Sequence, residues 1–317
     1  MLPARAIALL TCLLAVAGCN KDRQPVLIVF HAGSLSVPFR EVSRTFQKRH
    51  PGVRVLAEAA GSRDTARKVS DLGQRCDVLG SADYRVVENL LMPKHTAFNL
   101  VFATNEMTIA FTPRSRKQDQ LTAKNWHELL LDPEVTFGRS DPNRDPCGYR
   151  TEMVFQLAER HYKVPGLANK LRQKHGKRFI RPKETDLLAL LEAGQLDYMF
   201  IYTSVAKQHR LQHLQLPAEI NLSSPALAKR YEAARVEVTG KKPGQTITRM
   251  GAPIAYSVTI PKNAPRPKLA HQYVDLLLSK EGQAIMARNG QRPILPPRSR
   301  GPVPAKLRRH LGEAETK

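Results

Sequence analysis

Two serines stand at turns where the chain could bind an anion. Ser34 follows Gly33 shortly after the apolar run 26–30, and Ser62 follows a glycine shortly after the run 53–58. At a helix start, free N–H groups, the positive end of the helix dipole and a hydroxyl can together hold an oxyanion. Each serine could instead only cap its own helix. Because two such turns on consecutive units meet at one edge of a sheet, we predict an anion-binding site there.

A third helix start and a tyrosine could contribute to the same site. Asp145 is a good N-cap residue and Pro146 suits the first helical position, with Cys147 next in the chain. Tyr202 ends the strand-like run 197–202 and could direct its hydroxyl to the site. The alternatives are an ordinary helix start and a tyrosine that packs in the core. Neither motif identifies a ligand on its own.

The elements that position these residues alternate between strands and helices. The run 26–30 predicts a buried strand, and Phe39, Val42 and Phe46 form the apolar stripe of the helix after it. The run 53–58 and the helix that follows repeat this unit. Alternation of this kind predicts an α/β fold with a mostly parallel sheet covered on both faces. In such a sheet, ligands bind beyond the carboxyl ends of the strands.

The first residues have the pattern of an export signal followed by a lipid-modified cysteine. Arg5 precedes a run of uncharged residues that is shorter than a membrane span and typical of a secretory signal. The sequence Val-Ala-Gly-Cys at residues 16–19 resembles the bacterial lipobox, in which the cysteine receives the lipid. We expect a signal peptide at 1–18, a linker at 19–25 lipidated on Cys19, and a periplasmic or cell-surface location. An ordinary signal with an incidental cysteine is the alternative.

The composition is that of a globular protein with a strong positive charge. The chain has 317 residues, 42% hydrophobic and 25% charged, which excludes disorder and collagen-like repeats and suggests about two domains. The 50 basic and 28 acidic residues give a net charge of +22, which attracts anions of every kind. Nucleic acid is therefore an alternative ligand. We do not expect it, because the basic residues are scattered, only 6% of residues are aromatic, and the chain carries an export signal.

Two cysteines remain in the body of the chain, Cys76 and Cys147. We expect free thiols, although a disulfide is possible in an oxidising compartment. No cysteines or histidines have the spacing of a zinc site. A thiol-dependent enzyme is a distant alternative, with Cys147 as the nucleophile and His161 as its base. These two residues would lie about 21 Å apart along one helix, so we expect no enzyme.

Three stretches resemble a known family. The run 102–107 and the motif Asp-Pro-Cys-Gly-Tyr-Arg at 145–150 look like the molybdate/tungstate-binding proteins of ABC importers, in the archaeal-type WtpA branch of the ModA group. The run 278–283 is similar to the closing helix of type II periplasmic binding proteins in general. Together the resemblance covers about residues 26–297.

The resemblance implies an α/β, two-lobed type II periplasmic binding protein fold with two crossover strands, near residues 107–111 and 254–258. The lobes would close on a ligand between them, and a membrane permease would recognise the closed form. We expect the chain to be a monomer. The expected boundaries are lobe I at 26–106 plus 256–297, lobe II at 107–255, and a solvated basic tail at 298–317.

The resemblance also implies the ligand and its contacts. The ligand would be tungstate or molybdate, bound without a cofactor or a counter-cation and delivered to an ABC permease. Asp145 would contact the metal atom of the oxyanion. Sulfate, phosphate or an organic anion remains an alternative, because glycine-serine turns and helix starts suit any of them. The residues that match the contact positions of the family are Gly33, Ser34, Ser62, Asp145, Pro146, Cys147 and Tyr202.

One position departs from the pattern of the family. In the archaeal branch a second carboxylate precedes the tyrosine that matches Tyr202 and joins the aspartate at the metal, whereas Ile201 stands here. A lone Asp145 facing a doubly negative anion would be repelled unless it bonds the metal or caps its helix. We therefore expect a four-coordinate anion held by hydrogen bonds. We also expect Ile201→Glu to raise the affinity or to shift the preference toward tungstate.

Overall fold

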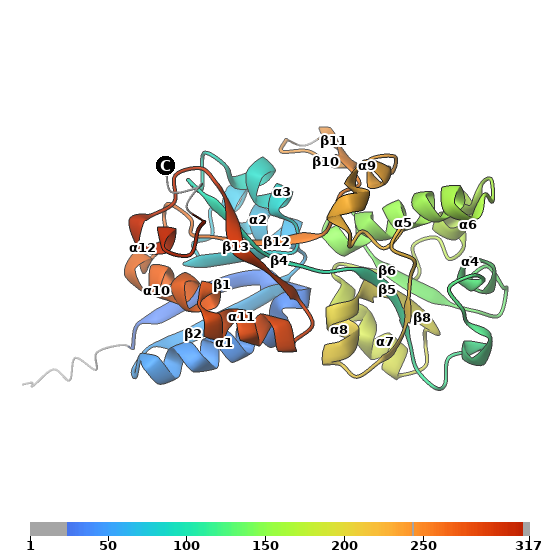
Figure 1. Ribbon diagram of the computed structural model, residues 1–317, viewed down its shortest axis with the longest axis horizontal. Helices are drawn as coiled ribbons and strands as arrows, with labels where there is room; N and C mark the ends of the chain where they lie inside the picture. Colours follow the sequence, from blue (N-terminus) through green and yellow to red (C-terminus); the bar gives the residue numbers. More distant parts are fainter. Residues whose placement is uncertain (1–23, 243, 313–317) are drawn as a thin grey trace, which may run out of the picture.

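The computed structural model describes residues 24–242 and 244–312, which form two lobes around two β-sheets (Figure 1). Lobe I contains a six-stranded sheet of order β13-β4-β12-β3-β1-β2, and lobe II contains a five-stranded sheet of order β7-β6-β8-β5-β9. Helices cover the sheet in each lobe (Figure 1). The predicted α/β, two-lobed fold is confirmed.

Lobe I is built from both ends of the chain. In its sheet β1 pairs in parallel with β2 and β3, whereas β12 and β13 run antiparallel to β4. Helix α1 buries Phe39, Val42 and Phe46 completely, as their spacing predicts. The elements are β1 (Val26–Ala32), η1 (Gly33–Leu35), α1 (Ser36–Arg49), β2 (Arg54–Ala60), α2 (Ser62–Ser70), β3 (Val78–Ser81), α3 (Tyr84–Val86), η2 (Val87–Leu91), β4 (Asn99–Thr104), β12 (Ala255–Thr259), α10 (Pro267–Leu278), α11 (Lys280–Arg288), β13 (Arg292–Arg300) and α12 (Ala305–Arg308).

Lobe II is built from the middle of the chain. Strands β6 and β8 are parallel, and β5 runs antiparallel to β8. The elements are β5 (Met107–Phe111), η3 (Gln118–Gln120), α4 (Trp126–Leu129), β6 (Phe137–Ser140), α5 (Pro146–Tyr162), α6 (Leu167–Gln173), β7 (Ile180–Arg181), η4 (Glu184–Leu187), α7 (Leu188–Glu192), β8 (Tyr198–Tyr202), α8 (Thr203–Gln208) and β9 (Gln212–Gln215).

The chain crosses between the two lobes twice. It leaves lobe I after β4, passes through residues 105–106 and enters lobe II as β5, and it returns to the sheet of lobe I as β12. The exact lobe boundaries given above stay predictions. Near the junction of the lobes stand η5 (Pro225–Leu227), α9 (Ala228–Tyr231) and a hairpin of β10 (Arg235–Thr239) and β11 (Thr246–Met250) (Figure 1).

The segment after residue 297 differs from the expected solvated tail. Strand β13 continues to Arg300 against β4, and α12 then packs on α10. The expectation is wrong as far as residue 312, because Val303, Leu307 and Leu311 recur every four residues and are all buried. The many basic residues of the segment hide this short apolar stripe. Residues 313–317 lie outside the described residues.

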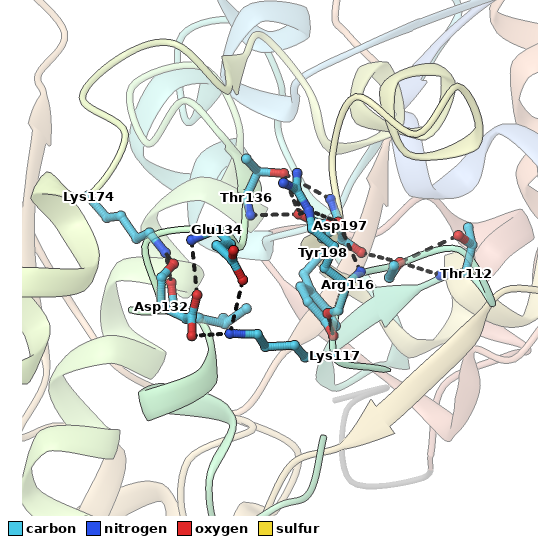
Figure 2. Close-up of polar contacts among 11 residues, drawn as sticks. Thr112, Arg116, Lys117, Asp132, Glu134, Thr136, Lys174, Asp197 and Tyr198 are labelled. Carbon is cyan, nitrogen blue, oxygen red and sulfur yellow. Dashed lines mark hydrogen bonds and ion pairs between the residues drawn. The ribbon is translucent and has the colours of Figure 1, made fainter. Parts of the chain in front are cut away.

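A polar cluster lies at the amino ends of β6 and β8. Figure 2 shows its hydrogen bonds and ion pairs. Asp197 accepts hydrogen bonds from the backbone N–H of Thr136 at 2.7 Å and of Arg116 at 3.0 Å. Burial raises the pKa of Asp197, but the hydrogen bonds from the side chain of Arg116 and from these two backbone N–H groups together hold it below its usual range. Nearby, Lys117 pairs with Asp132. The cluster stabilises lobe II at the end opposite Tyr202.

Three sequence predictions concern termini and thiols. The signal peptide at 1–18 and the lipidated Cys19 lie outside the described residues. Among the residues that the structure does describe, no helix is both long and apolar enough to span a bilayer. Cys76 and Cys147 are buried free thiols, as predicted.

Candidate functional site

The predicted site residues come from both lobes and meet at their junction. Ser34 lies in η1 after β1, and Ser62 begins α2 after β2. Asp145 precedes α5, and Tyr202 is the last residue of β8. These positions are the carboxyl ends of parallel strands, where the sequence pattern places ligands. All four residues are at least 99% buried.

The lobes approach each other closely beside Ser62. The backbone N–H of Arg63 in lobe I donates to the carbonyl oxygen of Arg144 in lobe II at 3.1 Å. A Cβ atom on Gly61 would lie 2.3 Å from that same oxygen and 3.2 Å from the Cβ of Asp145. Only glycine fits at this contact, which brings Ser62 close to Asp145.

A second carboxylate, Glu184, lies beside Asp145 and was missed in the sequence. The backbone N–H of Glu184 donates to Oδ2 of Asp145 at 3.2 Å. Both carboxyl oxygens of Glu184 are buried and have no hydrogen-bond partner among the described residues. A Cβ on Gly33 would lie 3.0 Å from Oε2 of Glu184, so this glycine lets the turn of lobe I approach the carboxylate. The expectation of a lone Asp145 is therefore wrong.

The carboxylate does not come from position 201. Ile201 is fully buried in the hydrophobic core, so Ile201→Glu would bury a charge there instead of adding a ligand. Glu184 begins η4, directly after the short strand β7, which pairs in parallel with β6. It reaches the site because β7 ends at the same edge of the sheet as β6. We therefore no longer expect Ile201→Glu to raise the affinity or to shift the preference toward tungstate.

The two carboxyl groups resist ionisation together. Burial raises the pKa of Asp145, and burial together with the neighbouring Asp145 raises the pKa of Glu184 far above its usual range. Asp145 makes no capping hydrogen bond to α5, so its side chain is not used as a helix cap. The pair therefore keeps a proton to higher pH than two separate, exposed carboxyl groups would.

Cys147 packs in the hydrophobic core, and its thiol is not reactive. Its Sγ lies 3.7 Å from the carbonyl oxygen of Phe200, and the residue is fully buried. Burial raises the pKa of the thiol well above its usual value, the opposite of what a nucleophile needs. The predicted ligand contact of Cys147 could then come only from its backbone, in the first turn of α5. Pro146 occupies the first position of the same helix, as predicted.

The hydroxyl of Ser34 is oriented by a chain of hydrogen bonds. Oδ1 of Asn105 accepts from the N–H of Glu106, so its amide nitrogen donates to the hydroxyl oxygen of Tyr256 at 3.0 Å. Tyr256 then donates to Oγ of Ser34 at 2.9 Å. Because Oγ already accepts, the O–H of Ser34 is left to donate.

Ser62 and Tyr202 are oriented in the same way. Oγ of Ser62 accepts from the backbone N–H of Ala82 at 2.9 Å, and the hydroxyl oxygen of Tyr202 accepts from Nη1 of Arg150 at 2.7 Å. An amide N–H and a guanidinium can only donate, so both hydroxyl protons point elsewhere. Burial raises the pKa of Tyr202 well above its usual value, which keeps its proton in place. Three hydroxyl donors therefore serve the junction.

A buried cation lies one hydrogen bond behind the site. Arg150 is 4% exposed and also donates to the carbonyl oxygen of Ala82 in lobe I at 2.8 Å. The expectation of a site without a counter-cation needs this correction, because the guanidinium charge acts through Tyr202. Oriented hydroxyl donors backed by a cation favour an anionic guest over a metal cation. Among the described residues, no group of three or more His, Cys, Asp or Glu is placed so that it could hold a metal ion.

Comparisons with known proteins show which family and fold this chain resembles. A family model described as bacterial extracellular solute-binding protein matches residues 27–292. An uncharacterized solute-binding protein of Petrotoga mobilis is 52% identical over 86% of this chain and 84% of its own. The molybdate/tungstate-binding protein WtpA of Thermococcus kodakarensis is 40% identical over 91% of this chain and 88% of its own. The periplasmic molybdate-binding protein of Azotobacter vinelandii shares the fold, with a TM-score of 0.58 at 17% identity over 85% of this chain and 99% of its own.

Proposed function

We propose that this chain, which belongs to the family of bacterial extracellular solute-binding proteins, binds tungstate and molybdate between its two lobes. Family membership and the relative WtpA confirm the resemblance drawn from the sequence. The matched relatives are binding proteins, in agreement with the expectation that the chain is not an enzyme.

The pair of Asp145 and Glu184 among oriented hydroxyl donors is the observation that carries the proposal. In our proposal Ser34, Ser62 and Tyr202 donate to oxygens of the anion, and the two carboxylates approach its central atom. A molybdenum or tungsten atom in its highest oxidation state is a large, hard cation that can add two oxygen ligands. This arrangement gives the metal atom six oxygen ligands and replaces the four-coordinate anion that was expected because Ile201 is not a carboxylate.

With both carboxyl groups ionised, the same pair disfavours sulfate and phosphate. Sulfur and phosphorus in these anions do not add carboxylate ligands, so each carboxylate would face only the negative oxygens of the guest. An ionised carboxylate and an anion in contact in a buried site repel each other strongly unless a proton lies between them. The site therefore supports discrimination by coordination chemistry as well as by size.

Transport and anchoring complete the proposal. Both lobes supply the site, so an occupied site would favour the closed form that an ABC permease recognises. Anchoring through a lipid on Cys19, in the periplasm or at the cell surface, rests on residues 1–19 alone. The intact mass of the exported protein checks this anchor, because an unmodified cysteine would refute it.

A panel of anions tests the proposed function. We expect tungstate and molybdate to raise the melting temperature and to bind in calorimetry at a ratio of one per chain, because each satisfies the buried carboxylates and donors together. Sulfate and phosphate at the same concentration should change the melting temperature little. A larger shift with sulfate or phosphate than with tungstate would contradict the proposal.

A further inference from the structure

A cluster of arginines surrounds a small cavity between the lobes, next to the site above, with which it shares Arg150. Arg85 follows the start of α3 in lobe I, Arg150 belongs to α5 in lobe II, and Arg249 belongs to β11 of the hairpin. We call these three residues the arginine cluster. The cavity is small: the volume open to the centre of a water molecule is about 10 Å³. That is room for about one water molecule or one small ion.

Arg249 has no partner for its buried donors. The residue is 4% exposed, and its Nε and Nη2 atoms are buried without a hydrogen-bond partner among the described residues. A guanidinium stays protonated in proteins, so Arg249 cannot lose its charge to escape the cost of burial. An unpaired buried charge costs several kcal/mol. Arg249 lines the cavity, and an acceptor bound there would remove this cost.

The carboxylate of Asp83 is already occupied. Its oxygens accept from the backbone N–H of Arg85 at 2.9 Å and from the hydroxyl of Tyr149 at 2.6 Å, and it pairs with Arg150 at 3.5 Å. The next carboxylate, Glu88, forms an ion pair with Arg300, at 3.5 Å. Three guanidinium groups thus face one carboxylate that borders the cavity. The excess of positive charge favours an anion over a neutral water.

We propose that this cavity binds one halide ion, chloride in the natural setting, which accepts hydrogen bonds from Arg249 and joins the two lobes. The space excludes a tetrahedral oxyanion, whose four oxygens need a larger volume. A carboxylate is excluded for the same reason. Among anions, a spherical monovalent ion comes nearest to this volume and matches the charge.

The halide should also strengthen closure. Lobe I, lobe II and the hairpin all line the cavity, so the ion binds only when they are in contact. By reciprocity, an ion that binds the closed form raises the affinity for any guest that also needs closure. This last step rests on the proposed function, whereas the halide site itself does not.

Thermal unfolding of the full chain in different salts tests the site. At constant ionic strength and without oxyanion, we expect a saturable rise in melting temperature with chloride and bromide and none with gluconate. Arg249→Met should abolish this rise and leave the protein in gluconate at least as stable as the parent. Arg235→Met, on the exposed face of the same hairpin, is the matched control and should keep the full response.

Diffraction from crystals of the unmodified chain grown with bromide gives a test that needs no variant. We expect an anomalous peak in the cavity beside Arg249. Absence of that peak, or equal melting temperatures in chloride and gluconate, would overturn the proposal. Tungstate should bind about fivefold or more tightly in chloride than in gluconate. A halide response without tungstate binding would refute the proposed function alone, and tungstate binding without a halide response would refute the halide site alone.

Discussion

Replacing Glu184 by glutamine is expected to weaken tungstate binding by about a hundredfold, because an interaction with a charged group is worth about 1.5–3 kcal/mol. Glutamine keeps the shape of the side chain but supplies a poor ligand for the metal atom. The variant should at the same time stabilise the ligand-free protein. Burial and the neighbour Asp145 raise the pKa of Glu184, so the folded state loses stability as pH rises above the unfolded pKa of the carboxyl group. Glutamine removes that loss.

For a ligand residue, the substitution should weaken tungstate binding and stabilise the ligand-free protein. For a purely structural residue, it should not change these two quantities in opposite directions. Calorimetry measures the affinity and thermal unfolding without ligand measures the stability, both for Glu184→Gln and for the control Asp197→Asn. The control changes a buried carboxylate at the other end of β8, where hydrogen bonds lower its pKa, so it should reduce stability and leave affinity unchanged. If Glu184→Gln bound tungstate as tightly as the parent, Glu184 would not be a ligand.

Tungstate binding at neutral pH should release about one proton, and affinity should rise by up to tenfold per pH unit while the carboxyl pair is still protonated. Burial raises the pKa of both Asp145 and Glu184, which favours a proton on the pair in the free protein. Coordination of the metal atom by both side chains requires both to be ionised. Tungstate should therefore bind more tightly as pH rises, until the pair is ionised in the free protein as well.

Calorimetry in two buffers of equal pH and different ionisation enthalpy counts the proton. Glu184→Gln should lose most of the release, since the pair then lacks one titrating member. Proton uptake, or an affinity that falls as pH rises, would mean that a protonated carboxyl group donates a hydrogen bond to a tetrahedral anion. That outcome would restore the four-coordinate arrangement.

The sequence predicts the parts of the fold and site that depend on local pattern. Phe39, Val42 and Phe46 have helical spacing, and α1 buries them as expected. Ser34 and Ser62 follow glycine at strand ends, and parallel strands β1 and β2 carry both to one edge. These results depend on short-range spacing and on the geometry of parallel sheets.

Other parts depend on contacts between distant segments, and there the sequence fails. Glu184 stands among polar residues that have no apolar period, and only the pairing of β7 with β6 brings it to Asp145. Arg150 belongs to the motif at 145–150, but the sequence does not predict its hydrogen bond to Tyr202, which depends on the packing of α5 against β8. Neither position carries a local signal of its role. Such residues are found only when the fold is known.

The coordination of tungsten in the bound complex tests the central claim most directly. X-ray absorption at a tungsten edge, together with a crystal structure of the complex, measures the number of oxygen neighbours and identifies them. Our account predicts six oxygens, one from Asp145 and one from Glu184, with the hydroxyls of Ser34, Ser62 and Tyr202 donating to oxygens of the anion. Four oxygens with both carboxyl groups turned away, or a guest bound elsewhere on the chain, would contradict it.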